Sequence, residues 1–300
     1  MTGAIMKNTK SESVGLILVG LVSVYWGFTT VLMKHALLYM SSTTYIVLRF
    51  VIAAALVLPV YADRIRRNMG RSLLLHGCVL GLLQLIPMEG TAIALQYTTA
   101  ANSVFISQLS FVFVPLIQCL LIRRLPDRML VSAIFFLLAG LAVFSDVGRD
   151  GLSAGSLICV STALFNAINV LCVKRFSATD DAVCLGVLQI AFCALFSIPV
   201  WLVNPGTVQW CADSVSILFF TSVLGSAVAF VASVSGQART VPVKVSFLGL
   251  LQPIFAMLGG AALPDEFGRV EEITSNMVLG SAIILMTLAL YLIKSKQIAQ

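Results

Sequence analysis

The sequence has little charge for its length. Only 11% of its 300 residues are Asp, Glu, Lys or Arg, whereas charged residues make up about a quarter of a typical soluble domain. Hydrophobic residues reach 59%, and the mean hydropathy is +1.00. This composition excludes an ordinary soluble globular domain. The net charge of +6 does not indicate nucleic-acid binding, because the basic residues form short clusters between apolar runs instead of one continuous basic face.

Motifs that carry chemistry are also scarce. The seven Cys residues form no C-x-x-C pair, and most lie within apolar runs, so they indicate neither a disulfide framework nor a zinc site. There is no P-loop, which argues against direct coupling to ATP. Residues 151–155 spell G-x-S-x-G, but a nucleophile elbow needs a strand-to-helix turn with a His within reach, and here an apolar helix follows. We therefore expect a protein that is not an enzyme and has no catalytic residue, metal site or cofactor.

Long apolar runs dominate what is present. The first, Val14–Lys34, contains only Ser, Thr, Gly, Tyr and Trp among its apolar residues and ends on a single Lys. About 20 such residues in a helix, rising 1.5 Å each, cross the roughly 30 Å hydrocarbon core of a bilayer. We therefore predict an integral membrane protein with ten spanning helices, at about 14–33, 43–61, 72–95, 101–122, 129–145, 155–173, 182–203, 215–235, 243–263 and 276–293.

The two halves of the chain repeat one another. The run Leu157–Lys174 has the shape of the first run, and both Asn166 and Lys174 follow their counterparts Trp26 and Lys34 by 140 residues. Five helices per repeat is an odd number, so the second repeat must be inverted relative to the first, as in many transporters with a substrate site between the repeats. The predicted fold is all-α, with ten transmembrane helices as two inverted five-helix repeats. The repeats are predicted at residues 14–145 and 155–293, and residues 1–13 and 294–300 form tails.

The distribution of Lys and Arg predicts the orientation. With the N-terminus in the cytoplasm, 15 basic residues fall on inside segments, and only Lys34, Arg149 and Arg269 fall outside. The opposite orientation would invert this ratio, against the positive-inside rule. We therefore expect a multi-pass protein of a prokaryotic cell (inner) membrane, with both termini in the cytoplasm.

Several short motifs follow one another along the chain. They are Trp26-Gly27 with Lys34, Leu48-Arg49-Phe50, Ala94–Asn102, Gly236-Gln237, Gln252-Pro253 and Pro264–Glu266. Together, over residues 14–293, they resemble the EamA-type family of the drug/metabolite transporter (DMT) superfamily. The resemblance implies a secondary transporter that moves small polar metabolites such as amino acids, often outward. It also implies alternating access around a central cavity lined by helices of both repeats.

Glu89 is the outlier among the polar residues within the spans. An ionised carboxylate there costs several kcal/mol unless it faces water or a partner. Pro87 and Gly90 lie close by and could open the backbone toward a cavity. One interpretation is a cavity acid that binds an amine or carries a coupling proton. The other is an interfacial carboxylate, or a structural partner of Arg49.

Neutral polar residues complete the candidate site. Trp26 lies mid-span, so it either packs between helices or lines the cavity. Asn166 and Asn169 are three residues apart and share one helix face, and Gln108 and Gln252 lie in equivalent helices of the two repeats. The predicted substrate-binding residues are Glu89, Trp26, Thr30, Gln108, Asn166, Asn169 and Gln252.

The expected partners are a small-molecule substrate, the lipid bilayer and, as an open alternative, coupling protons; the chain is either a monomer or a homodimer. Two other functions remain open. A transporter or flippase of nucleotide-like or lipid-linked cargo would have a large basic cleft, and a non-transporting membrane scaffold would have a dry, tightly packed interior.

Overall fold

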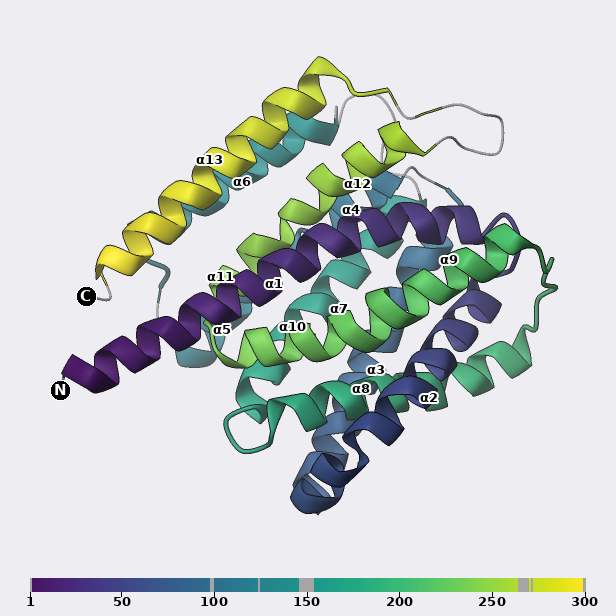
Figure 1. Ribbon diagram of the computed structural model, residues 1–300. Helices are drawn as coiled ribbons and strands as arrows, with labels where there is room; N and C mark the ends of the chain where they lie inside the picture. Colours follow the sequence, from purple (N-terminus) through teal and green to yellow (C-terminus); the bar gives the residue numbers. More distant parts are fainter. Residues whose placement is uncertain are drawn as a thin grey trace.

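The computed structural model describes residues 2–97, 100–123, 125–145, 154–263, 270 and 272–298, and only the backbone for residues 2–10, 100–102, 145, 154, 156 and 296–298 (Figure 1). Arg149, Arg269 and the Pro264–Glu266 motif lie outside the described residues. So do the first three residues of the G-x-S-x-G motif and Thr98 and Thr99 of the Ala94–Asn102 motif.

Helices account for nearly all of the described chain. The first half contains α1 (Thr2–Ala36), α2 (Ser42–Asn68), α3 (Arg71–Ala94), α4 (Ala100–Ser107), α5 (Ser110–Ile122) and α6 (Arg128–Ser145). The second half contains α7 (Ala154–Phe176), α8 (Ala182–Val203), α9 (Ala212–Ser222), the π-helix η1 (Val223–Val228), α10 (Ala229–Ala238), α11 (Pro242–Gly249), α12 (Leu251–Ala262) and α13 (Ser275–Ile298).

The helices form ten spans. Among the described residues, nine helical segments are long and apolar enough to cross a membrane, and Arg128–Phe144 of α6 adds a shorter tenth. The prediction of an all-α protein with ten spans is confirmed. Three of the predicted spans are interrupted within their length: 101–122 consists of α4 and α5, 215–235 of α9, η1 and α10, and 243–263 of α11 and α12. In addition, α1 starts at Thr2, well before residue 14, and α2 extends to Asn68 instead of 61.

The second repeat is inverted relative to the first. At one end of the bundle, the Lys174 Nζ donates to the carbonyl oxygen of Ala238 at 2.9 Å, and Lys244 forms an ion pair with Glu12 at 2.8 Å. This end therefore contains the first turns of the apolar part of α1 but the last turn of α7, so these equivalent helices run in opposite directions. It is also where α1 begins and α13 ends in Figure 1.

One contact lies between equivalent positions of the two repeats. Gly140 of α6 and Gly280 of α13 are 140 residues apart, and a Cβ on Gly280 would lie 2.6 Å from the carbonyl oxygen of Gly140. Figure 1 shows these two helices side by side at one edge of the bundle. Close approach at small residues is the usual way in which helices associate within membranes.

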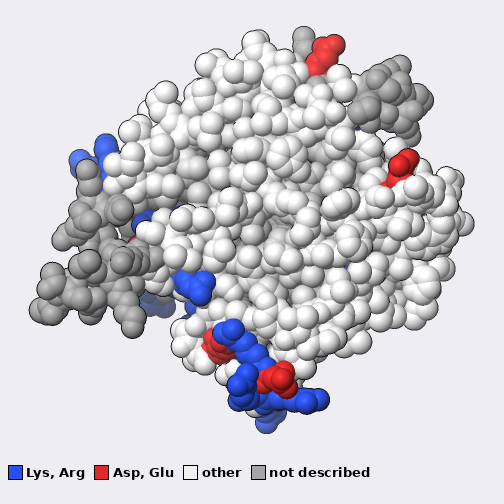
Figure 2. Space-filling model, viewed as in Figure 1, with Lys and Arg blue, Asp and Glu red and all other residues white. Residues whose placement is uncertain are grey.

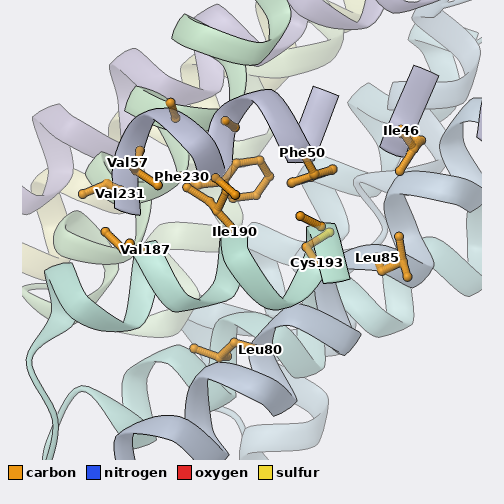
Figure 3. Packing of buried hydrophobic residues seen from close by; sticks show 14 of the residues in the cluster. Ile46, Phe50, Val57, Leu80, Leu85, Val187, Ile190, Cys193, Phe230 and Val231 are labelled. Carbon is orange, nitrogen blue, oxygen red and sulfur yellow. The ribbon is translucent and has the colours of Figure 1, made fainter. Parts of the chain in front are cut away.

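Two buried clusters hold the bundle together, and each combines both repeats. The first joins α2 and α3 to α8 and α10, with Phe50 and Phe230 rings 5.7 Å apart (Figure 3). The second joins α5 and α6 to α11–α13, with Phe111 against Phe247. Because each cluster contains helices of both halves, the two repeats pack as one body.

Charges gather at one end of the bundle, which we call the basic end and define by Arg64, Lys174 and Lys244. Figure 2 shows blue atoms along the left edge and at the bottom, and a broad surface with few charges above and to the right of them. Here Arg64 forms two hydrogen bonds with Asp181, at 3.1 and 2.8 Å. The Asp181 side chain also caps α8 by accepting from the Cys184 N–H. This contact ties α2 of the first repeat to the start of α8 in the second.

Candidate functional site

A cavity of about 140 Å³ lies between the two repeats. An apolar cavity of about this size can hold benzene, so the space suits a small solute. Most of the residues that line it have polar side chains, and they include six of the seven predicted site residues: Trp26, Thr30, Gln108, Asn166, Asn169 and Gln252. Trp26 and Asn166, which occupy equivalent positions in the two repeats, meet at the same cavity.

Two helix breaks border the cavity at equivalent places. Between α4 and α5, the Leu109 N–H bonds to the carbonyl of Ile106, three residues back instead of four. Between α11 and α12, Leu250 makes the same short bond to Phe247. Pro253 has no N–H for the carbonyl of Gly249 and its ring crowds that carbonyl, which accounts for the second break. Interrupted helices commonly form the binding sites of transporters.

A third irregularity is the π-helix η1. Its Gly225 carbonyl accepts hydrogen bonds from two side chains of the first repeat, the Trp26 Nε1 at 3.0 Å and the Arg49 Nη2 at 3.3 Å. Single π-turns inside helices free such backbone groups and are frequent at functional sites. The bond to Gly225 fixes the indole of Trp26 at the cavity, where its ring packs 5.1 Å from that of Phe230.

Arg49 is the cation of the site. It lines the cavity and is only 3% exposed. Its Nε donates to the Ser226 Oγ at 2.7 Å and its Nη1 to the Tyr45 hydroxyl at 3.3 Å. In the described part of the chain, no carboxylate lies within ion-pair distance of Arg49, so the predicted alternative of a pair with Glu89 was wrong.

Glu89 does not belong to the cavity lining. The α3 residues that line it are Gln84, Met88 and Thr91, and Glu89 is turned about 100° from Met88 around the helix. Both carboxyl oxygens are buried and have no hydrogen-bond partner among the described residues. The carboxyl lies near Cys193 of α8.

The amides in the lining differ in the partners of their side chains, and Gln237 bonds within its own helix to the Ser233 Oγ at 2.9 Å. Some hold helices together: the Gln189 Nε2 donates to the Gln84 Oε1 at 3.0 Å, and the Asn169 Nδ2 donates to the Leu80 carbonyl at 3.4 Å. The side chains of Gln108, Asn166 and Gln252 form no hydrogen bond within the described residues, so their polar atoms are available to a ligand. Other lining residues were missed by sequence reasoning, and most are small hydroxyl residues without a distinctive pattern: Ser23, Thr29, Ser107, Ser110, Ser233 and Ser246. Arg49 and Gln237, also in the lining, lay within sequence motifs that had drawn attention to them.

This arrangement, two inverted repeats of membrane-spanning helices around a polar cavity, is typical of a membrane transporter. Residues 13–145 and 153–293 each match the EamA-like transporter family. The chain belongs to that family, and it is a multi-pass membrane transporter. Among the residues that the structure describes, no three His, Cys, Asp or Glu side chains gather in a group that could hold a metal ion.

Similar proteins agree with this assignment. An uncharacterized transporter of Archaeoglobus fulgidus is 23% identical over 268 residues, which cover 89% of this chain and 84% of the relative. The uncharacterized transporter YvbV of Bacillus subtilis is 25% identical over 300 residues, covering 97% and 95%. A crystal structure shares the fold, with a TM-score of 0.70 and 17% identity over 95% of this chain and 99% of the other.

Proposed function

We propose that the protein is a secondary transporter that binds a small polar metabolite in the central cavity and exports it by alternating access. The observation that carries the proposal is the set of unpaired amides, Gln108, Asn166 and Gln252, which face one cavity from both repeats. Unsatisfied polar groups are costly within a membrane. A polar ligand that forms hydrogen bonds with these amides is a physical reason for their presence at the cavity. Amino acids are among the solutes to test, given the family.

Alternating access requires a seal at each end of the cavity. At the basic end, the Glu12–Lys244 ion pair joins α1 to α11, and the backbones of Gly15 and Gly236 are in close contact. We propose that this end faces the cytoplasm, as the positive-inside rule favours, and that its contacts separate when the cavity opens inward.

Glu89 is proposed to serve in coupling instead of in substrate contact. A buried carboxyl without a hydrogen-bond partner is costly when ionised and much less so when protonated. Its place outside the lining would let it bind a proton without touching the solute. The transport assay that identifies the substrate also measures whether a proton gradient drives uptake.

The test is counterflow with the purified protein in liposomes. A labelled panel of amino acids, small organic acids, amines and nucleosides is offered with and without a pH gradient. Accumulation of one class by protein-containing vesicles, and not by empty ones, supports the proposal. Failure of every solute in the panel to accumulate would contradict the proposal and favour a lipid-like cargo or a non-transporting role.

A further inference from the structure

We infer that the substrate of the central cavity is a small carboxylate with a net negative charge, held by Arg49; this rests on the proposed function. Among the described residues, the lining contains one cation and no acid. The guanidinium has only neutral partners, namely a hydroxyl on Ser226, a phenol on Tyr45 and a carbonyl on Gly225. A buried charge without a counter-ion is costly, and an anionic ligand would supply one.

The fold does not need a charge at this position. Gln189 of α8 follows Arg49 of α2 by 140 residues, so the two positions are equivalent in the two repeats. Ser226 and Gln84 are separated by the same offset to within two residues, so they are equivalent as well. The bond from Gln189 to Gln84 is therefore the counterpart of the bond from Arg49 to Ser226. In one repeat a neutral amide makes the interhelical contact, and in the other an arginine makes it beside the cavity. The charge of Arg49 thus exceeds what helix packing requires.

The geometry of Arg49 suits a carboxylate. A guanidinium has five N–H donors in a planar fork, and Arg49 uses three of them in the hydrogen bonds above. The remaining donors can bind a planar carboxylate through charge-assisted hydrogen bonds. A phosphate monoester carries about −1.5 to −2 charges at pH 7, more than a single cation neutralises.

The rest of the lining favours a net anion over a zwitterion. An ammonium group would find only neutral acceptors there, such as the amide oxygens of Asn166 and Gln252, and no carboxylate in the described lining. For the same reason, we expect amines, which carry only a positive charge, to bind more weakly than carboxylates or zwitterions. A cavity of about 140 Å³ matches solutes near the size of benzene, which lactate, pyruvate and butyrate approximate.

The experiment compares matched solutes on matched proteins. Lactate, pyruvate and butyrate are each tested beside their neutral amides, and alanine serves as the zwitterion of the same size. Binding to the detergent-purified protein is measured by the shift of the thermal midpoint, and transport by counterflow in liposomes. The variants are Arg49→Gln and Arg49→Lys, with Arg66→Gln as control, because Arg66 is an exposed cation on the same helix. Arg49→Gln should fold, since glutamine is the residue at the equivalent position of the other repeat.

We expect at least one carboxylate to bind, its amide to bind at least 10-fold more weakly, and alanine to lie between them. Arg49→Gln should weaken carboxylate binding roughly 10- to 100-fold, as for loss of a hydrogen bond to a charged group, and should abolish the preference over the amide. Arg49→Lys should keep the preference with lower affinity, and Arg66→Gln should behave as the wild type.

Other outcomes separate the two proposals. Transport of a neutral or cationic solute that persists in Arg49→Gln would overturn the carboxylate inference and leave the transporter proposal standing. Carboxylate binding that depends on Arg49 without counterflow of any solute would support the inference on the site and contradict the transport function. Failure of all three acids to bind overturns the inference.

Discussion

Gln108 and Gly249 lie at equivalent helix breaks of the two repeats and meet at the cavity. The Oε1 of Gln108 is 2.6 Å from the point that a Cβ on Gly249 would occupy. The missing side chain at Gly249 therefore makes the space in which the Gln108 amide rests. Since that amide forms no hydrogen bond within the described residues, its orientation depends on this close approach.

Gly249→Ala should alter solute binding more than folding. The atom in the way is the far end of a flexible side chain, so Gln108 can turn aside at little cost to the fold. Displacing one cavity amide should weaken binding of the transported solute roughly 2- to 10-fold, the effect of one ordinary hydrogen bond. Solute-dependent thermal shifts of Gly249→Ala, Gln108→Ala and the double variant measure this. The two effects should overlap in the double variant; simple additivity would contradict a shared role.

Gly27→Ala should affect folding directly. A Cβ at Gly27 would lie 2.5 Å from the Gln252 carbonyl oxygen and 3.0 Å from the Ala256 N, and backbone atoms of α12 cannot turn aside. Overpacking of this kind costs about 1–3 kcal/mol. Gly20→Ala on the same helix is the control, because its Cβ would meet only Leu248 at 3.9 Å. We expect a lower thermal midpoint and yield for Gly27→Ala alone; equal stability of both variants would contradict the tight α1–α12 contact.

The Arg64–Asp181 pair predicts a pH dependence of stability. Partial burial raises the pKa of Asp181, but hydrogen bonds from Arg64 and from Cys184 outweigh it and hold that pKa below its usual value. Ionised Asp181 therefore stabilises the fold above a pH of about 4, and this contribution is lost as the pH falls through the folded-state pKa.

Asp181→Asn isolates this effect, because asparagine still caps the helix but carries no charge and cannot form an ion pair with Arg64. The variant should be less stable than the wild type at pH 7, by at most about 1 kcal/mol for an exposed pair. The difference should shrink below a pH of about 4. Thermal midpoints of both proteins across this range give the answer, and a difference that grows toward acid pH would refute the assignment.

Glu89→Gln should separate coupling from binding. The carboxyl lies outside the lining and its oxygens have no partner in the described part of the chain, so a neutral amide of the same shape should leave solute affinity unchanged. We expect the variant to fold and to lose the response of uptake to a pH gradient. Uptake in liposomes at several imposed gradients is the measurement. If uptake by the variant still responds to the pH gradient, Glu89 has no role in coupling. If the variant loses affinity for the solute, Glu89 contributes to substrate binding.

The ten-span, two-repeat fold could be predicted from the sequence because hydropathy reports directly on the spans and the 140-residue offset indicates the repeat. The 140-residue offset placed Trp26 and Asn166 in equivalent helices, and both line the cavity. Asn169, Thr30, Gln108 and Gln252 followed from the same logic, since amides and hydroxyls within spans rarely face lipid.

The remaining features depend on tertiary contacts. An apolar run does not reveal a π-turn, so the capture of the Gly225 carbonyl by Trp26 and Arg49 had no sequence signal. Glu89 has the strongest signal of any residue in the spans, yet rotation by one residue along α3 takes it out of the lining. The sequence indicated Arg49 only as part of a motif and as a partner of Glu89, because periodicity does not show that its side chain is buried beside the cavity.

The central claim is that solute passes through the cavity between the repeats. Blocking this cavity with a bulky group tests the claim most directly. Val170 lines the cavity and Leu164 on the same helix is exposed, so each is replaced by Cys in a protein without its native cysteines. Both are then labelled to completion with a bulky thiol reagent before counterflow. Labelling of Val170→Cys should abolish counterflow, and excess solute should slow the labelling, whereas labelled Leu164→Cys should retain uptake. Undiminished counterflow by fully labelled Val170→Cys would contradict the account.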